Sequence, residues 1–328
     1  MRTRLIDRLA GRLVVFDAFQ ERVQTVEAFV PAFAHLGVDH ILSQISALVR
    51  FSPLPAGARL APSSDQVMHA VFFGDKHPRA DVENLVLYYI DSFKTTGRNG
   101  IRFEHGDVMP SAPGGAEYRY CYSYALAPRA ESFSHWLRGD MLASFDWTDL
   151  GAFTGDKKLA QVWLALSRSE IEVSKRAEPD TPFGVRIEIR PPYRRNPVWG
   201  GLVKGVIDGV ICALQNHMEP TIPPEVLERI AEYLPPQDER EGKEMDRLEQ
   251  EIEILLRDPR SAVLGGVPRL VSPYRSGVKW DPSDHLCVAG ELLATQPEPS
   301  DDGWAIKGEV FELFRNSGSS NQSSSKPT

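Results

Sequence analysis

Residues 198–217, VWGGLVKGVIDGVICALQNH, constrain the fold more than any other segment. Apolar side chains recur there at helical spacing over most of the circumference: Val198, Leu202, Val203, Val206, Ile207, Val210, Ile211 and Leu214. A helix that is apolar on most sides has to be buried. Gly201, Gly205 and Gly209 recur every fourth residue, each costing up to about 1 kcal/mol relative to alanine in a helix. This spacing indicates that a backbone or a ligand packs closely against that line.

The surrounding patterns predict an α/β (α+β) protein with mixed sheets flanked by helices. Val185, Ile187 and Ile189 alternate with charged residues, which is typical of a half-buried strand. By the same reasoning we expect strands at 45–54, 66–74, 100–106, 117–127, 285–294 and 304–314. Helices are expected at 1–40, 81–93, within 129–180 and at 240–257, and residues 316–328 form a Ser-rich tail that we expect to be disordered.

Composition, net charge and cysteine spacing argue against a disordered chain, a broadly basic nucleic-acid-binding protein and a structural zinc site. The 328-residue chain is 42% hydrophobic and 25% charged, which is ordinary for a globular protein. Its formal net charge of −8 argues against broad, charge-driven adhesion to nucleic acid and leaves only a local basic groove open. The three cysteines form no CxxC pair, which indicates reduced, buried thiols.

Neither a secretory signal nor a membrane span is expected, so we predict a cytoplasmic protein without a membrane partner. Arg2, Arg4 and Asp7 interrupt the first apolar residues, and no stretch approaches eighteen apolar residues. The helical spacing of Leu5, Leu9, Leu13 and Phe16 favours an N-terminal helix docked on the core, with a membrane-surface helix as the alternative.

A group of polar residues follows the face of the expected helix at 81–93. Asp81, Asn84, Tyr88 and Asp91 recur at helical spacing, Glu83 lies beside them, and Glu104 ends the core of the next strand. Clustered carboxylates are the ligands that Mg²⁺ requires, and such ions can hold a phosphodiester during hydrolysis. The alternative is that acidic residues in the first helical turn only complement the helix dipole.

The run DVENLVLYYIDSF at 81–93, followed by GIRFEH at 100–105, resembles the core of RusA-type Holliday-junction resolvases. Those small dimeric enzymes carry a D-x-D-N-L-x-K-x-x-x-D-x-L helix and a later G-x-x-x-D-D segment, bind Mg²⁺ and cleave branched DNA. The resemblance implies that Asp81, Glu83, Asp91 and Glu104 bind Mg²⁺. The lysine position of the family is occupied by Leu87.

A second segment, GLVKGVIDGV at 201–210, is similar to the same motif. Here Lys204 and Asp208 match the lysine and the later aspartate, the first two acids fall on Val198 and Gly200, and the segment WDPSD follows at 280–284. The resemblance implies a duplicated, fused pseudo-dimer of two related RusA-like lobes, 41–128 and 181–315, joined by a helical insertion at 129–180 and preceded by a helical segment at 1–40. The alternative for Lys204 and Asp208 is an exposed i,i+4 ion pair.

Two further surfaces were weighed as binding sites for partners. Arg186, Arg190, Arg194 and Arg195 form a basic cluster that suits phosphates, although Glu188 among them also fits an ordinary solvated face. The charged helix at 240–257 is either a solvated surface helix or a site for another protein.

The expected function is binding and Mg²⁺-dependent cleavage of a branched or otherwise structured nucleic acid. Asp81, Glu83, Asp91 and Lys204 would be its catalytic residues, with Lys204 stabilising charge if the two lobes face one another. The alternative is a non-catalytic interaction or scaffold protein that retains a degenerate nuclease-like fold, and a small-molecule enzyme without a known signature is a third reading.

Overall fold

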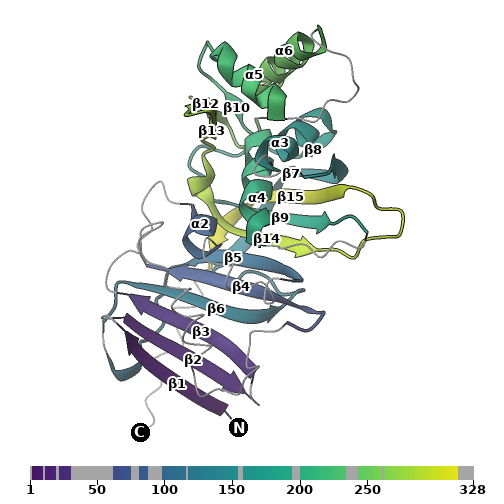
Figure 1. Cartoon of the computed structure of the whole chain (residues 1–328). Helices are drawn as coiled ribbons and strands as arrows, with labels where there is room; N and C mark the ends of the chain where they lie inside the picture. Colours follow the sequence, from purple (N-terminus) through teal and green to yellow (C-terminus); the bar gives the residue numbers. More distant parts are fainter. Residues whose placement is uncertain are drawn as a thin grey trace.

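The computed structural model describes residues 2–9, 12–19, 22–30, 62–74, 81–87, 98–115, 117–153, 158–193, 200–233, 243–260 and 262–316. Within these residues, one mixed sheet of eleven strands is the central element (Figure 1). In spatial order its strands are β1 (Arg2–Leu9), β2 (Arg12–Phe19), β3 (Arg22–Val30), β6 (Tyr120–Pro128), β4 (Gln66–Phe73), β5 (Gly100–Gly106), β14 (Cys287–Ala294), β9 (Phe183–Arg190), β15 (Trp304–Arg315), β7 (Trp136–Gly151) and β8 (Ile171–Val173).

The central part of the sheet has the same sequence of parallel and antiparallel pairings on both sides of the antiparallel β5–β14 pair, counted outward from it. Going outward, β5 is parallel to β4, which is antiparallel to β6, and β6 is antiparallel to β3. On the other side β14 is parallel to β9, which is antiparallel to β15, and β15 is antiparallel to β7. Helix α2 (Val82–Leu87) lies between β4 and β5 in the chain, and α4 (Gly200–Ala213) lies between β9 and β14.

The remaining elements complete the half of the molecule that carries β7 and β15 (Figure 1). They are α3 (Lys158–Arg168), α5 (Pro224–Tyr233), α6 (Lys243–Arg257), the paired strands β10 (Asn216–His217) with β11 (Gly266–Val267) and β12 (Val271–Tyr274) with β13 (Gly277–Trp280), and the 3-10 turn η3 (Asp284–Leu286). The 3-10 turn η2 (Pro113–Gly115) lies between β5 and β6 in the chain. None of the helices in the described ranges is long and apolar enough to cross a membrane.

Helix α4 is buried as its sequence predicts, and α3 accounts for part of its glycine line. A Cβ atom on Gly209 would lie 2.6 Å from the Cβ of Val162, and one on Gly205 would lie 3.0 Å from the Cβ of Lys158. A Cβ on Gly201 would meet nothing within 4 Å. The close neighbour is therefore another helix, and only the second and third glycines are required by it.

Several expected elements are confirmed. Strands occupy 66–73, 100–106, 120–128, 183–190, 287–294 and 304–315, and helices occupy 158–168, 200–213 and 243–257. Cys121, Cys212 and Cys287 are free and buried, as expected. The strand expected at 45–54, the second half of the helix at 81–93 and the tail from 317 lie outside the described residues.

The helical segment expected at 1–40 is wrong where the structure describes it. β1, β2 and β3 form an antiparallel meander that pairs with β6. Leu13 and Val15 are buried with Phe29 and Val71 in a small core cluster. The β-branched and aromatic residues of 13–30 fit this pleated surface, and sheet pairing overrides the helical spacing of the leucines.

The helical insertion expected at 129–180 is wrong in part, because α3 is preceded by the sixteen-residue strand β7. β7 pairs with β15 from Trp136 opposite Arg315 to Gly151 opposite Trp304, and this long ladder decides its conformation. The same sheet runs through both expected lobes, so the structure does not divide the chain into two separate lobes.

Candidate metal centre

Four carboxylates gather where α2 meets α4 and β14; we call them the acid cluster. Asp81 directly precedes α2, Glu83 lies in its first turn, Asp208 lies on α4, and Asp284 begins the turn η3 before β14. Helix α2 contacts both α4 and β14. Residues 121 and 123 positions apart are therefore brought together by the packing of one helix against the other.

Lys204 joins these carboxylates through its ammonium group. Its Nζ atom lies 3.2 Å from Asp81 Oδ2, 3.0 Å from Glu83 Oε1 and 2.9 Å from Asp208 Oδ2. The Lys204 side chain is 45% exposed, whereas those of Glu83 and Asp208 are 1% and 7% exposed. The i,i+4 pair considered from sequence exists, but its carboxylate is buried and belongs to a larger cluster.

Asp284 brings a further negative charge close to the first two carboxylates. Asp81, Glu83 and Asp284 each offer one oxygen, and these three oxygens lie within 4.8 Å of one another. Carboxylate oxygens grouped at this spacing are the donor set that hard divalent cations bind.

Burial and mutual repulsion keep the cluster from carrying its full charge. Burial raises the pKa of Glu83 well above its ordinary value, and Asp208, Asp81 and Asp284 raise it further against the opposing effect of Lys204. Burial also raises the pKa of Asp208, and burial together with Asp81 and Asp208 raises the pKa of Asp284 to about 8. Protons or a cation must therefore neutralise part of the cluster.

The same surroundings favour the charged form of Lys204, whereas they disfavour the charged forms of the carboxylates. Burial opposes its charged form, but the attraction of Glu83, Asp208 and Asp81 outweighs this and raises the pKa of Lys204. The ammonium thus stays charged, and it offsets one of the four carboxylates.

Two buried oxygens of the cluster lack a hydrogen-bond donor. Within the part of the chain that the structure describes, Glu83 Oε2 and Asp208 Oδ1 have no hydrogen-bond partner. A buried acceptor left without a donor is uncommon in folded proteins and calls for an explanation such as an ion or a shared proton. The donor set and these two oxygens together fit a divalent cation.

The structure brings together three of the residues singled out from sequence, namely Asp81, Glu83 and Lys204. Asp91 lies outside the described residues. Asp208 and Asp284 were noted in the sequence but not assigned to the site. Asp208 follows Lys204 by one helical turn, which was the available signal, whereas nothing in the sequence around Asp284 indicates its position beside α2.

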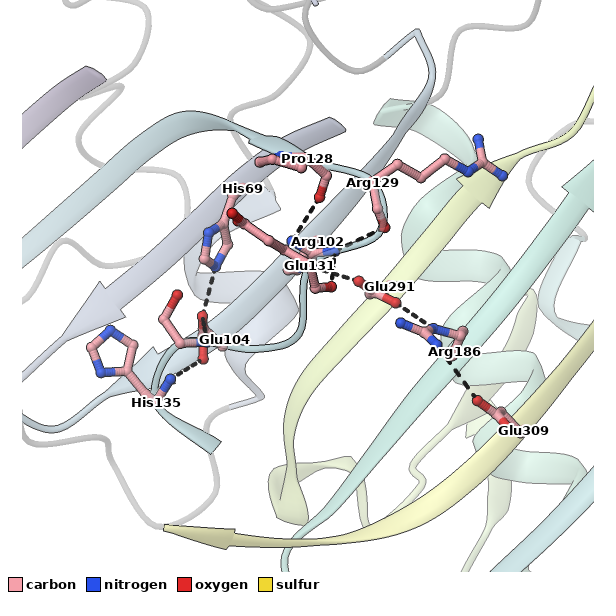
Figure 2. A network of polar contacts seen from close by, with 11 residues as sticks. His69, Arg102, Glu104, Pro128, Arg129, Glu131, His135, Arg186, Glu291 and Glu309 are labelled. Atoms are coloured by element: carbon pink, nitrogen blue, oxygen red, sulfur yellow. Dashed lines mark hydrogen bonds and ion pairs between the residues drawn. The ribbon is translucent and has the colours of Figure 1, made fainter. Parts of the chain in front are cut away.

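Glu104, the fourth expected metal ligand, lies in a different environment. Its carboxylate accepts hydrogen bonds from His69 Nε2 at 2.7 Å and from the backbone N–H groups of Ser134 at 2.9 Å and His135 at 2.8 Å (Figure 2). Burial opposes its ionisation, but these hydrogen bonds and His69 lower its pKa overall. Glu104 is thus fully engaged as a structural anchor.

The direction of side chains along β5 explains this separation. Ile101 and Phe103 point into the main core with Val82 of α2, so Arg102 and Glu104 point to the other face of the sheet. There Arg102 donates to Glu291 at 2.5 Å, and Glu291 also accepts from Arg186 (Figure 2). The expectation that Glu104 joins Asp81 and Glu83 at one metal is therefore wrong.

The arginines expected to bind phosphates are engaged within the protein. Arg186 lies 2.5 Å from Glu291 and 4.0 Å from Glu309. Arg190 lies 3.2 Å from Asp301 and stacks over the ring of Trp147. Arg194 and Arg195 lie outside the described residues. The charges of the two described arginines are thus compensated by carboxylates of the protein itself.

The charged helix α6 packs its apolar side into the core. Ile252 and Leu256 are fully buried, Arg168 donates to Glu251 at 2.8 Å, and Ile254 is 67% exposed. This burial agrees with a surface helix that has a solvated face.

A cavity of about 820 Å³ opens at the edge of the sheet where β4 and β5 end. Its lining includes Gly74, His105, Asp107, His285 and Arg315. His285 directly follows Asp284, so the cavity begins next to the residue that carries one carboxylate of the acid cluster.

Comparisons with known proteins add no assignment. No family model matches the chain, and no curated protein matches it. Among solved structures, a cyanuric acid hydrolase aligns with 88% of this chain and 67% of its own, at 9% identity and a TM-score of 0.19. Similarity at this level carries no argument about fold or function.

Proposed function

We propose that the acid cluster binds a divalent cation and that the chain hydrolyses a phosphodiester bond of a structured nucleic acid. The observation that carries this proposal is the position of Lys204. Its Nζ lies within 3.2 Å of two carboxylates at the start of α2, Glu83 and the directly preceding Asp81, which are 121 and 123 residues away in the chain. Mixed carboxylate and ammonium groups around one point suit the charge distribution of phosphoryl transfer.

The donor set defines which residues would hold the cation. Asp81, Glu83 and Asp284 offer oxygens within 4.8 Å of one another, and Glu83 Oε2 and Asp208 Oδ1 are the buried oxygens without a donor. Bound Mg²⁺ or Mn²⁺ would supply Lewis-acid activation of a phosphate oxygen. Glu83 and Asp208 lie on helices, Asp81 directly precedes α2 and Asp284 lies in the short turn η3, so regular elements position the cluster.

Two residues of the cluster have further roles in this proposal. Lys204 places a permanent positive charge where negative charge develops on the phosphate oxygens. Asp208 holds that ammonium at 2.9 Å with one oxygen, and its second oxygen, which lacks a hydrogen-bond donor among the described residues, is the acceptor for a proton of the attacking water.

The proposal extends to the origin of the fold. We infer that β4–α2–β5–β6 and β9–α4–β14–β15 are two copies of one unit fused in a single chain, like the two subunits of a RusA-type dimer. The mirrored strand pairing supports this inference. So do the buried pairs Leu85–Val86 on α2 and Leu202–Val203 on α4, which occupy matching positions of the two motifs.

The second candidate is a non-catalytic interaction protein that retains this fold. The pairing of Arg186 and Arg190 with carboxylates favours it, because neither guanidinium is free to bind a phosphate without breaking an ion pair. The net charge of −8 points the same way.

The deciding experiment combines metal binding with cleavage. Purified chain is titrated with Mg²⁺ and Mn²⁺ by calorimetry and incubated with branched, duplex and single-stranded nucleic acids. We expect Glu83→Gln to abolish metal binding and Lys204→Met to slow cleavage by about 10²–10³-fold. Glu251→Gln, which removes an exposed carboxylate from the pair with Arg168, is the matched control.

Each outcome separates the candidates. Cleavage that is lost in Glu83→Gln and kept in Glu251→Gln supports the nuclease. Metal binding without cleavage of any substrate favours the interaction protein, and cleavage that persists in Glu83→Gln would place the active site elsewhere.

A further inference from the structure

The acid cluster is built from both halves of the mirrored sheet. Asp81 and Glu83 belong to the unit β4–α2–β5, while Lys204, Asp208 and Asp284 belong to the unit β9–α4–β14. The unit β4–α2–β5 lacks the ammonium and Asp284, and the unit β9–α4–β14 lacks Asp81 and Glu83, so neither unit alone contains the three carboxylates whose oxygens lie within 4.8 Å of one another. The cluster therefore exists only because both units are in place.

Two equivalent units would allow a second cluster with the contributions exchanged. Leu85 and Val86 of α2 correspond to Leu202 and Val203 of α4, and all four are buried. The same correspondence takes Asp81 to Val198, Glu83 to Gly200 and Lys204 to Leu87. A second cluster would thus have two uncharged residues in place of its first acids and a leucine in place of its lysine.

Of the acids of that motif only Asp91, the counterpart of Asp208, would remain, and a single carboxylate is a poor site for a hard cation. Val198 and Gly200 offer no side-chain oxygen, and Leu87 offers no positive charge to a phosphate. The chemistry that the fused chain keeps is therefore concentrated in the acid cluster, where the buried oxygens Glu83 Oε2 and Asp208 Oδ1 lack a donor among the described residues.

We propose that the chain has one composite cation site and cuts one strand of its nucleic acid per encounter, leaving a nick. This inference rests on the proposed function. One water is consumed for each cut: its oxygen bonds to phosphorus, one phosphorus–oxygen ester bond breaks, and the products end in a phosphate monoester and a hydroxyl. The proton released by the water passes to a carboxylate of the cluster, and the departing oxygen takes up a proton.

The first arm of the test counts cation sites independently of cleavage. Mn²⁺ bound to the full chain is measured by electron paramagnetic resonance, for the wild type, Glu83→Gln and the control Glu251→Gln. One composite site predicts that Glu83→Gln loses all specific Mn²⁺ binding and that the control loses none. Retention of about half of the bound Mn²⁺ in Glu83→Gln would overturn the proposal, because a second site would then exist.

The second arm follows the product. A supercoiled plasmid that extrudes a branched cruciform is incubated with the chain and Mn²⁺, and nicked and linear circles are quantified with time. We expect nicked circles to accumulate first and linear DNA to appear only by later, independent cuts. Linear DNA formed at the same initial rate would overturn the single-cut proposal and leave the nuclease function standing.

The two arms also separate failure of the nuclease assignment. If wild-type chain binds Mn²⁺ at one site but cuts none of the substrates, the proposed function is wrong, and with it the nick, while the single composite site stands. If the wild type binds no Mn²⁺ even with nucleic acid present, both proposals fail.

Discussion

Glu83→Gln is the substitution that best distinguishes a cation site from a structural ion cluster. It keeps the size of a fully buried side chain and removes one negative charge from a site with four carboxyl groups and one ammonium. In a structural ion pair this change would cost stability. In a cation site without its cation, the change relieves repulsion between carboxylates. The variant is then at least as stable as the wild type but loses metal binding.

The magnitude follows from the distances. At an effective dielectric constant of about 20, two unit charges 4.8 Å apart repel by about 3.5 kcal/mol, so Asp81 and Asp284, when both are ionised, oppose an ionised Glu83 by about 7 kcal/mol. The attraction between Lys204 Nζ and Glu83 Oε1, which lie 3.0 Å apart, opposes this repulsion by about 5.5 kcal/mol. Repulsion exceeds attraction even before burial is counted, which agrees with the raised pKa of Glu83. Ionisation of Glu83 is therefore unfavourable in the metal-free protein.

Thermal unfolding with and without Mn²⁺ is the assay. Without metal we expect Glu83→Gln to unfold at the wild-type temperature or slightly above it. At a Mn²⁺ concentration of 100 times the dissociation constant, the wild type gains about 2.7 kcal/mol. For 328 residues, an unfolding entropy of about 2.1 cal/mol/K per residue converts this into about 4 °C. The variant should gain none of it.

Two results would refute this reasoning. A metal-free variant that is several kcal/mol less stable than the wild type would mean that Glu83 is ionised and serves mainly as a partner of Lys204. An equal Mn²⁺-dependent shift in the variant and the wild type would mean that the ion binds without Glu83.

Three further predictions concern stability. Arg102 is fully buried against a buried carboxylate, so Arg102→Met should cost about 3–5 kcal/mol in urea unfolding, whereas Arg269→Met at an exposed pair should cost less than about 1 kcal/mol. Gly209→Ala places a Cβ 2.6 Å from an atom of α3 and should cost about 1–3 kcal/mol, whereas Gly201→Ala meets nothing and should gain up to about 1 kcal/mol; chemical denaturation of both tests this. The pKa of Asp284 is raised from 3.8 to about 8, so the folded state binds its proton more tightly than the unfolded state. Stability should fall as pH rises from about 4 to 8, and Asp284→Asn should flatten that dependence in denaturation curves measured without metal.

The sequence alone determined the elements in which apolar residues recur with a clear period and so mark the side that is buried. The alternation at 185–189 and the apolar helix at 198–214 required no knowledge of their neighbours, because each shows directly which side is buried. The motif around Asp81 and Glu83 and the motif around Lys204 were likewise visible as local patterns. That the two would meet was an expectation conditional on the lobes facing one another.

Tertiary structure decided the rest. The leucines at 5, 9 and 13 satisfy a helical period, but β1 pairs with β2, β2 with β3 and β3 with β6, which makes their segment part of the sheet. Asp284 reaches Asp81 only because β14 adds to β5, and Glu104 is removed from the acid cluster because successive residues of β5 point to opposite faces. Local patterns specify which side of an element is buried, whereas the partner that buries it is set by contacts between residues that are distant in the sequence.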